Sequence, residues 1–333
     1  MRFLMQPRIL FAILCLVWGT TWLALKTGAM NVPPALFSGT RWLAAGIILL
    51  VWHAARGGRV RLRPHLMRTL VLVALTMIAL NQALMMYAMR YVGSGLAAVI
   101  NSALTPIALL GFAIALGQER FSLRQALGIA LGIAGLLLLF GPAALSGDLD
   151  LWELLGAVGV AAGCVSYCAG SVLARPLMHR VSPIEVAATT NVIGGAILLI
   201  GSLAFEPGSA RALTGGWGTA ALTAWIYLLL MGSLGATIIY LQLVRDWGAS
   251  RTGTYAFISP VIAVVLGLVV YSERLRATDA AGMALMLAAA GVLLGSKKAS
   301  SETEKGQDRA KAKPRPSPPL RLNPAGAGRI PSE

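Results

Sequence analysis

Apolar residues fill most of the chain in long runs, which are separated by short polar stretches or stretches rich in glycine and proline. A helix rises 1.5 Å per residue, so about 20 apolar residues cross the roughly 30 Å of hydrocarbon in a bilayer. Ten runs come close to this length and predict an all-α integral membrane protein. The predicted transmembrane helices are 9–29, 34–53, 66–89, 95–117, 122–141, 152–174, 184–205, 218–244, 252–271 and 277–295.

The second half of the sequence repeats the first half. Matching residues recur at an offset of 154 in the later spans and of 149 in the earlier ones. The matches are Thr105-Pro106 with Ser259-Pro260, Glu119-Arg120 with Glu273-Arg274, Gly128 with Gly282, Lys26 with Arg175, and Pro34 with Pro183. Because each half crosses the bilayer an odd number of times, we expect two inverted five-helix repeats around a central cavity, the architecture of alternating-access carriers.

Composition marks the boundaries of these repeats. The first repeat is predicted over 9–141 and the second over 152–295, with a turn-rich linker at 142–151 between them. From residue 296 the chain turns to Lys, Arg, Ser, Pro and Gly without an apolar period. Residues 296–333 are therefore expected to be a disordered, basic cytoplasmic tail.

Charge distribution indicates which partner the basic residues have. The 333 residues are 57% hydrophobic and 12% charged, whereas an ordinary soluble domain has about 25% charged residues. A net charge of +15 would suggest nucleic acid in a soluble protein. With both termini in the cytoplasm, however, most Lys and Arg fall on the cytoplasmic side of the predicted spans, as the positive-inside rule requires. Membrane lipid, not nucleic acid, is the expected partner of this charge.

Polar and aromatic side chains on several spans are candidates for the cavity wall. Asn101 and Thr105 belong to a polar stripe on the fourth span, and Tyr255 and Ser259 belong to its counterpart on the ninth. Each such group is expected either to join helices or to contact a small-molecule substrate. The candidate substrate-binding residues are Trp18, Trp22, Asn81, Asn101, Thr105, Tyr167, Tyr240, Gln242, Tyr255 and Ser259.

Three further residues have predicted gating or structural roles. Pro106 and Pro260 lie near the middle of the fourth and ninth spans, where each removes a backbone hydrogen bond. The resulting bends are expected to face a wet cavity, or else to be purely structural. Lys26 lies at the end of its span, so its side chain is expected to reach the interface or to meet a ligand.

Arg41 lies inside the second span, where a charge costs about 2.5–3.5 kcal/mol on insertion scales. We expect it to act in an outer gate or to hold an anionic group. No Asp or Glu lies at the middle of any span, although carriers that exchange protons for organic cations normally need one. A neutral, zwitterionic or carboxylate-bearing substrate is therefore favoured.

The motifs that would indicate an enzyme are missing from the sequence. His53, His65 and His179 fall on predicted loops, and there is no HExxH or Gly-x-Ser-x-Gly sequence. The cysteines lie in apolar runs without CxxC spacing. We therefore predict no enzymatic activity, no cofactor and no metal. A membrane enzyme and a non-transporting scaffold or sensor stay as alternatives to transport.

Gly128, Gly132 and Gly135 form a ridge of small residues on the fifth span, which lets another helix approach closely. The partner of this ridge is either the tenth span or a second protomer. A homodimer through the glycine face is therefore one of two possibilities.

A set of short motifs in the first half identifies a family resemblance. They are Tyr87-Ala88-Met89-Arg90-Tyr91, Gly95-Leu96-Ala97-Ala98, Pro106, Gly117-Gln118-Glu119-Arg120 and Gly128. Together they resemble the repeat signature of EamA-type carriers in the drug/metabolite transporter superfamily. The resemblance implies a ten-helix inverted-repeat basket that exports amino acids or related metabolites across a bacterial inner membrane. Because related carriers move other cargo, efflux of a sugar, a nucleotide derivative or a drug is the alternative function.

Overall fold

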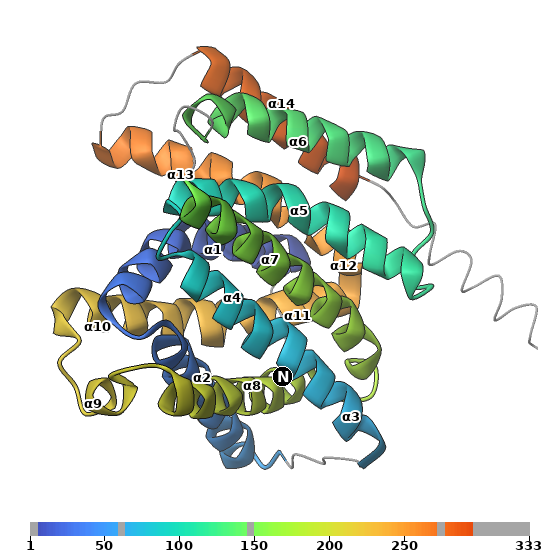
Figure 1. The fold of residues 1–333 in the computed structure, drawn as a ribbon. Coiled ribbons are helices and arrows are strands. Elements are labelled where there is room, and N and C mark those ends of the chain that lie inside the picture. The colour runs from blue at the N-terminus through green and yellow to red at the C-terminus, as the bar shows by residue number, and fades with distance from the viewer. Residues whose placement is uncertain (1–5, 59–63, 145–149, 272–276, 296–333) are drawn as a thin grey trace, which may run out of the picture. The chain divides into compact units, whose positions relative to one another are not determined.

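The computed structural model describes residues 6–58, 64–144, 150–271 and 277–295, and every regular element in these ranges is a helix (Figure 1). These residues belong to one compact unit, Met1–Gly295. The predicted tail, part of the predicted linker and Glu273-Arg274 lie outside the described residues.

The first half consists of helices that follow the predicted spans closely. They are α1 (Pro7–Asn31), α2 (Pro34–Ala55), α3 (Pro64–Val73), η1 (Ala74–Leu80), α4 (Asn81–Ala88), α5 (Ser94–Ala115) and α6 (Leu123–Ala144). The segments α3, η1 and α4 form one continuous helix with a π-helical middle. Helix α6 continues through Ala144 and so includes the first residues of the predicted linker.

The second half contains the corresponding helices and two short additional ones. They are α7 (Leu151–Leu177), α8 (Pro183–Phe205), α9 (Ser209–Leu213), α10 (Gly218–Tyr227), η2 (Leu228–Ala236), α11 (Thr237–Trp247), α12 (Ala249–Thr252), α13 (Tyr255–Tyr271) and α14 (Ala277–Leu294). The π-helix η2 interrupts a continuous helix in the same way as η1. It begins 154 residues after η1, which is the offset of the later sequence matches.

Among the described residues, eight helices are long and apolar enough to cross a membrane. They are α1, α2, the continuous helix Pro64–Ala88, α5, α7, α8, the continuous helix Gly218–Trp247, and α14. Helix α13 has 17 residues, and the apolar part of α6 is Leu123–Leu139. Over the described residues the all-helical prediction is confirmed, while ten spans and their inversion stay predictions.

Helices α2 and α8 are antiparallel neighbours whose backbones nearly touch (Figure 1). A methyl group added at Gly39 would lie 2.6 Å from the backbone N of Leu199, and one at Gly46 would lie 2.6 Å from that of Val192. The residue number of the contact on α8 therefore falls as the residue number on α2 rises, so the two helices run in opposite directions. Only glycine leaves room for two backbones at this distance.

Carboxylates lie at both ends of the α2–α8 pair. At the end of α8, Glu206 accepts hydrogen bonds from the backbone N–H groups of Ala35 and Leu36, at 3.0 and 3.1 Å. These donors are in the first turn of α2, where N–H groups have no partner within the helix. At the opposite end, His53 Nε2 lies 3.5 Å from Glu185 Oε1.

Helices α6 and α14 form a second antiparallel pair (Figure 1). A Cβ atom at Gly128 would meet Leu293, and one at Gly135 would lie 2.7 Å from the carbonyl oxygen of Gly282. Gly132 faces the ring of Phe257 on α13. Within the described residues the glycine ridge is thus occupied by α14, which corresponds to the predicted tenth span, and by Phe257 of α13. Association of two copies stays a prediction that would need another surface.

Gly195→Ala tests the close approach of α2 and α8. A Cβ atom there would lie 2.3 Å from the backbone N of Leu43, so we expect a loss of about 1–3 kcal/mol of stability. Gly201→Ala on the same helix is the control, because nothing lies within 4 Å of its added methyl. Thermal unfolding in detergent would measure both variants, and equal melting temperatures would contradict this packing.

Candidate functional site

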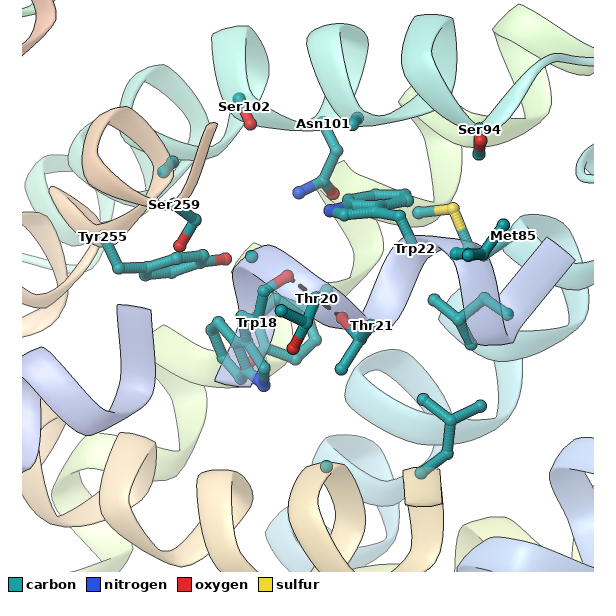
Figure 2. Close-up of a pocket in the computed structure, with 18 of the residues that line it drawn as sticks. Trp18, Thr20, Thr21, Trp22, Met85, Ser94, Asn101, Ser102, Tyr255 and Ser259 are labelled. Atoms are coloured by element: carbon teal, nitrogen blue, oxygen red, sulfur yellow. Dashed lines mark hydrogen bonds between the residues drawn. The ribbon is translucent and has the colours of Figure 1, made fainter. Parts of the chain in front are cut away.

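A cavity of about 690 Å³ lies between helices of the two halves. The first half contributes residues of α1, α2, η1, α4 and α5, and the second half contributes residues of α7, η2, α11 and α13. In Figure 2, Ser94, Asn101 and Ser102 lie along α5, while Trp18, Thr21 and Trp22 come from α1. The cavity size is typical of sites that hold small molecules.

The structure brings most of the predicted site residues together at this cavity. Those that line it are Trp18, Trp22, Asn81, Asn101, Tyr167, Tyr255, Ser259, Arg41 and Pro260. Sequence reasoning did not select Thr21 and Leu25, although Trp18, Thr21, Trp22 and Leu25 share one helical face. That spacing is the signal that could have found them.

Four aromatic rings from four helices form a cluster at the cavity, comprising Trp18 of α1, Tyr167 of α7, Tyr240 of α11 and Tyr255 of α13. The centroid of Trp18 lies 4.4 Å from Tyr255, 5.0 Å from Tyr240 and 6.2 Å from Tyr167. Tyr240 lies behind the other rings, fully buried, and its hydroxyl donates to Ser171 Oγ at 2.9 Å. It packs against the wall and does not line the cavity.

Gln242 lies in a different place from the one predicted. It lines a second pocket of about 440 Å³, together with Trp52, His53 and Arg245. Thr237 of the same helix lines the main cavity. Five residues separate the two positions, a rotation of roughly 140° around an α-helix, so their side chains face different spaces. The assignment of Gln242 to the main cavity is corrected.

Both predicted cavity hydroxyls near the prolines bond to backbone carbonyls. Thr105 donates to the Asn101 carbonyl oxygen at 2.7 Å and lies 3.3 Å from Cys164 Sγ. Ser259 donates to the Cys15 carbonyl oxygen at 3.1 Å and so joins α13 to α1. Thr105 and Pro106 are buried and do not line the cavity, which corrects the placement of Thr105.

Lys26 has a structural position outside the cavity lining. Its ammonium donates to the carbonyl oxygens of Met89 and Val92, at 2.5 and 2.9 Å. A cation at a helix C-terminus stabilises the exposed carbonyls there. Arg175, the sequence match of Lys26, has a similar position. The Arg175 guanidinium lies near Gly248, which caps the C-terminal end of α11, and donates to the Gln118 carbonyl oxygen at 3.5 Å.

A network of polar side chains surrounds Arg41 in the cavity wall. Arg41 Nη1 donates to Ser233 Oγ at 2.6 Å, and Nη2 donates to Gln82 Oε1 at 2.9 Å. Gln82 donates in turn to Asn81 Oδ1, and Asn81 donates to the Gly163 carbonyl oxygen. The network joins α2, α4, η2 and α7, and therefore both halves.

The sequence model of the EamA-like transporter family matches residues 7–141 and again residues 154–295. The inner membrane transporter YedA of Escherichia coli K12, whose function is uncharacterized, is 32% identical over 268 residues, covering 80% of this chain and 83% of YedA. The uncharacterized transporter YvbV of Bacillus subtilis 168 is 29% identical over 283 residues, covering 85% of this chain and 89% of YvbV.

A solved crystal structure has the same fold, with a TM-score of 0.69 at 23% identity, covering 86% of this chain and 97% of that one. The family model and the similarity to YedA show that the chain belongs to the EamA-like transporter family. It is a multi-pass membrane transporter of the drug/metabolite superfamily. The family resemblance of its motifs is confirmed.

Lys26→Met tests whether this lysine holds the end of α4. Two carbonyls would lose their charged donor, so we expect the free energy of unfolding to fall by about 1 kcal/mol or more. The melting temperature should fall with it. Lys26→Arg retains a donor and should recover most of the loss. A thermal unfolding curve for Lys26→Met that overlays the wild type would contradict the structural role.

Proposed function

We propose that this protein is a secondary transporter that exports amino acids or related small metabolites by alternating access. Ten helices in two inverted repeats enclose the cavity, and both termini lie in the cytoplasm of a bacterium whose inner membrane the protein spans. Substrate enters the cavity from one side, the two halves rock about it, and the cavity then opens to the other side.

The observation that carries this proposal is a cavity whose walls come from both halves and which adjoins a cluster of rings from both halves. The cavity contains amide, hydroxyl and aromatic groups that suit a small polar molecule with an apolar part. Trp18, Tyr167 and Tyr255 of the aromatic cluster line this cavity, and the ring of Tyr240 packs against all three of them.

The helix pairs support an inverted arrangement of the repeats. Helices α2 and α8 begin at the sequence matches Pro34 and Pro183, yet they run antiparallel. Helices α6 and α14, which contain the matched Gly128 and Gly282, are antiparallel as well. Equivalent helices that run in opposite directions are what a two-fold axis in the membrane plane produces.

Cysteine labelling in intact cells tests this topology. Arg120 follows α5 and Thr278 lies at the start of α14, and both are exposed. We expect a cysteine at Arg120 to react with an impermeant maleimide only after permeabilisation, and a cysteine at Thr278 to react from outside. The three native cysteines are buried, so the protein without added cysteine provides the background. Labelling of both sites from one side would contradict the inverted repeat.

Metabolite comparison tests the export function without a guess at the cargo. We expect an overexpressing strain to contain less of the exported compound, and to release more of it, than a deletion strain. Counterflow in proteoliposomes loaded with a panel of amino acids, sugars, nucleosides and drugs would then identify its class. Exchange of amino acids supports the proposal, exchange of another class alone replaces its substrate, and absence of any flux contradicts transport.

A further inference from the structure

Arg41 is a buried charge that the surrounding protein does not neutralise. Only 2% of its surface is exposed, although it belongs to the cavity wall. Among the described residues no Asp or Glu lines the cavity. Arg41 forms no ion pair with any Asp or Glu of the described residues.

The partners that Arg41 does have are neutral and leave part of its guanidinium free. Ser233 and Gln82 each accept one hydrogen bond, from Nη1 and Nη2, and the buried Nε has no hydrogen-bond partner among the described residues. The face of the Trp42 ring lies 4.9 Å from the guanidinium carbon. A guanidinium has five N–H donors, so donors remain for a further group. A buried cation without an opposite charge is costly, and an anion that enters the cavity removes that cost.

The two accepting side chains hold the guanidinium in a fixed direction. Gln82 is the second residue of α4, close to the end of η1, and Ser233 lies within η2, so the cation is held near the π-helical segments of both halves. π-Helical turns are frequent at functional sites. A preorganised planar guanidinium matches a carboxylate better than a flexible ammonium does, since it donates two parallel hydrogen bonds.

We infer that Arg41 binds the carboxylate of the transported molecule, so that the cargo is a small organic carboxylate, zwitterionic amino acids included. This inference rests on the proposed function, because it names the chemical class that the same cavity accepts. The rest of the molecule lies against Trp22, Met85 and Leu228, which also line the cavity. If the cargo also carries an ammonium group, the faces of aromatic rings in the cavity can interact with it in place of an Asp or Glu side chain.

Binding to the purified full chain in detergent tests the inference without any variant. Matched acids and amides of increasing size are titrated, namely propanoate, 4-methylpentanoate, 3-phenylpropanoate and leucine against their primary amides, and thermal unfolding gives apparent dissociation constants. We expect at least one acid to bind about tenfold or more tightly than its amide. Equal affinities for every pair, or no binding of any acid, would overturn the inference.

Substitution then assigns the preference to Arg41. Arg41→Gln should abolish the preference for acid over amide, and Arg41→Lys should retain part of it. Arg90→Gln is the matched control, because it removes the same charge from an exposed arginine that does not line the cavity. If Arg41 only joins α2 to η2, then Arg41→Gln lowers stability but keeps the acid preference, which overturns the inference. If Arg41→Gln does not fold, Arg41→Lys and the wild-type acid and amide pairs decide.

Counterflow of the same compounds separates this inference from the proposed function. Proteoliposomes that bind the acid but show no flux would contradict transport and leave the carboxylate site intact. Flux of amides equal to that of acids, with no effect of Arg41→Lys, would overturn the carboxylate site and leave transport intact. We expect flux of the acids, with a preference that falls in both Arg41 variants and is unchanged in Arg90→Gln.

Discussion

The contact between the backbones of α2 and α8 is the constraint on which the rest of the site depends. Gly39, Gly46 and Gly195 let the two helices approach until backbone atoms touch, and Glu206 ties the start of α2 to the end of α8. This pairing joins one half of the chain to the other. It also fixes the position of Arg41, which α2 presents to the cavity and to side chains of both halves.

The polar groups within the helices divide into two kinds by their partners. Thr105, Ser259 and Lys26 bond to backbone carbonyls and hold helices or helix ends together. Such bonds satisfy groups that lipid cannot satisfy. Arg41 differs, because its acceptors are side chains of other helices and its Nε has no hydrogen-bond partner among the described residues. Residue type alone does not separate these two kinds. Their neighbours in the structure do.

The sequence predicted the helices well and individual side-chain roles less well. Apolar length and the prolines at helix starts set the spans to within a few residues, and most candidate residues do meet at one cavity. The π-helical segments were not predicted, because stretches of seven and nine mostly apolar residues have no period that separates π from α. The role of Lys26 was also hidden, since the carbonyls it binds are more than 60 residues away. Gln242 was placed in the wrong pocket because the sequence does not show how its helix is rotated about its axis, and this rotation decides which space the side chain faces.

The aromatic cluster has a consequence for how the protein responds to its surroundings. Trp18, Tyr167, Tyr240 and Tyr255 meet through ring faces and edges, and the hydrogen bond of Tyr240 goes to another uncharged group, Ser171. Parting the rings therefore wets apolar surface without breaking ion pairs. Ionic strength, which screens charges, has little effect on a cluster of this kind. Temperature and excluded cosolutes act on it directly, since both change the free energy of hydrating apolar surface.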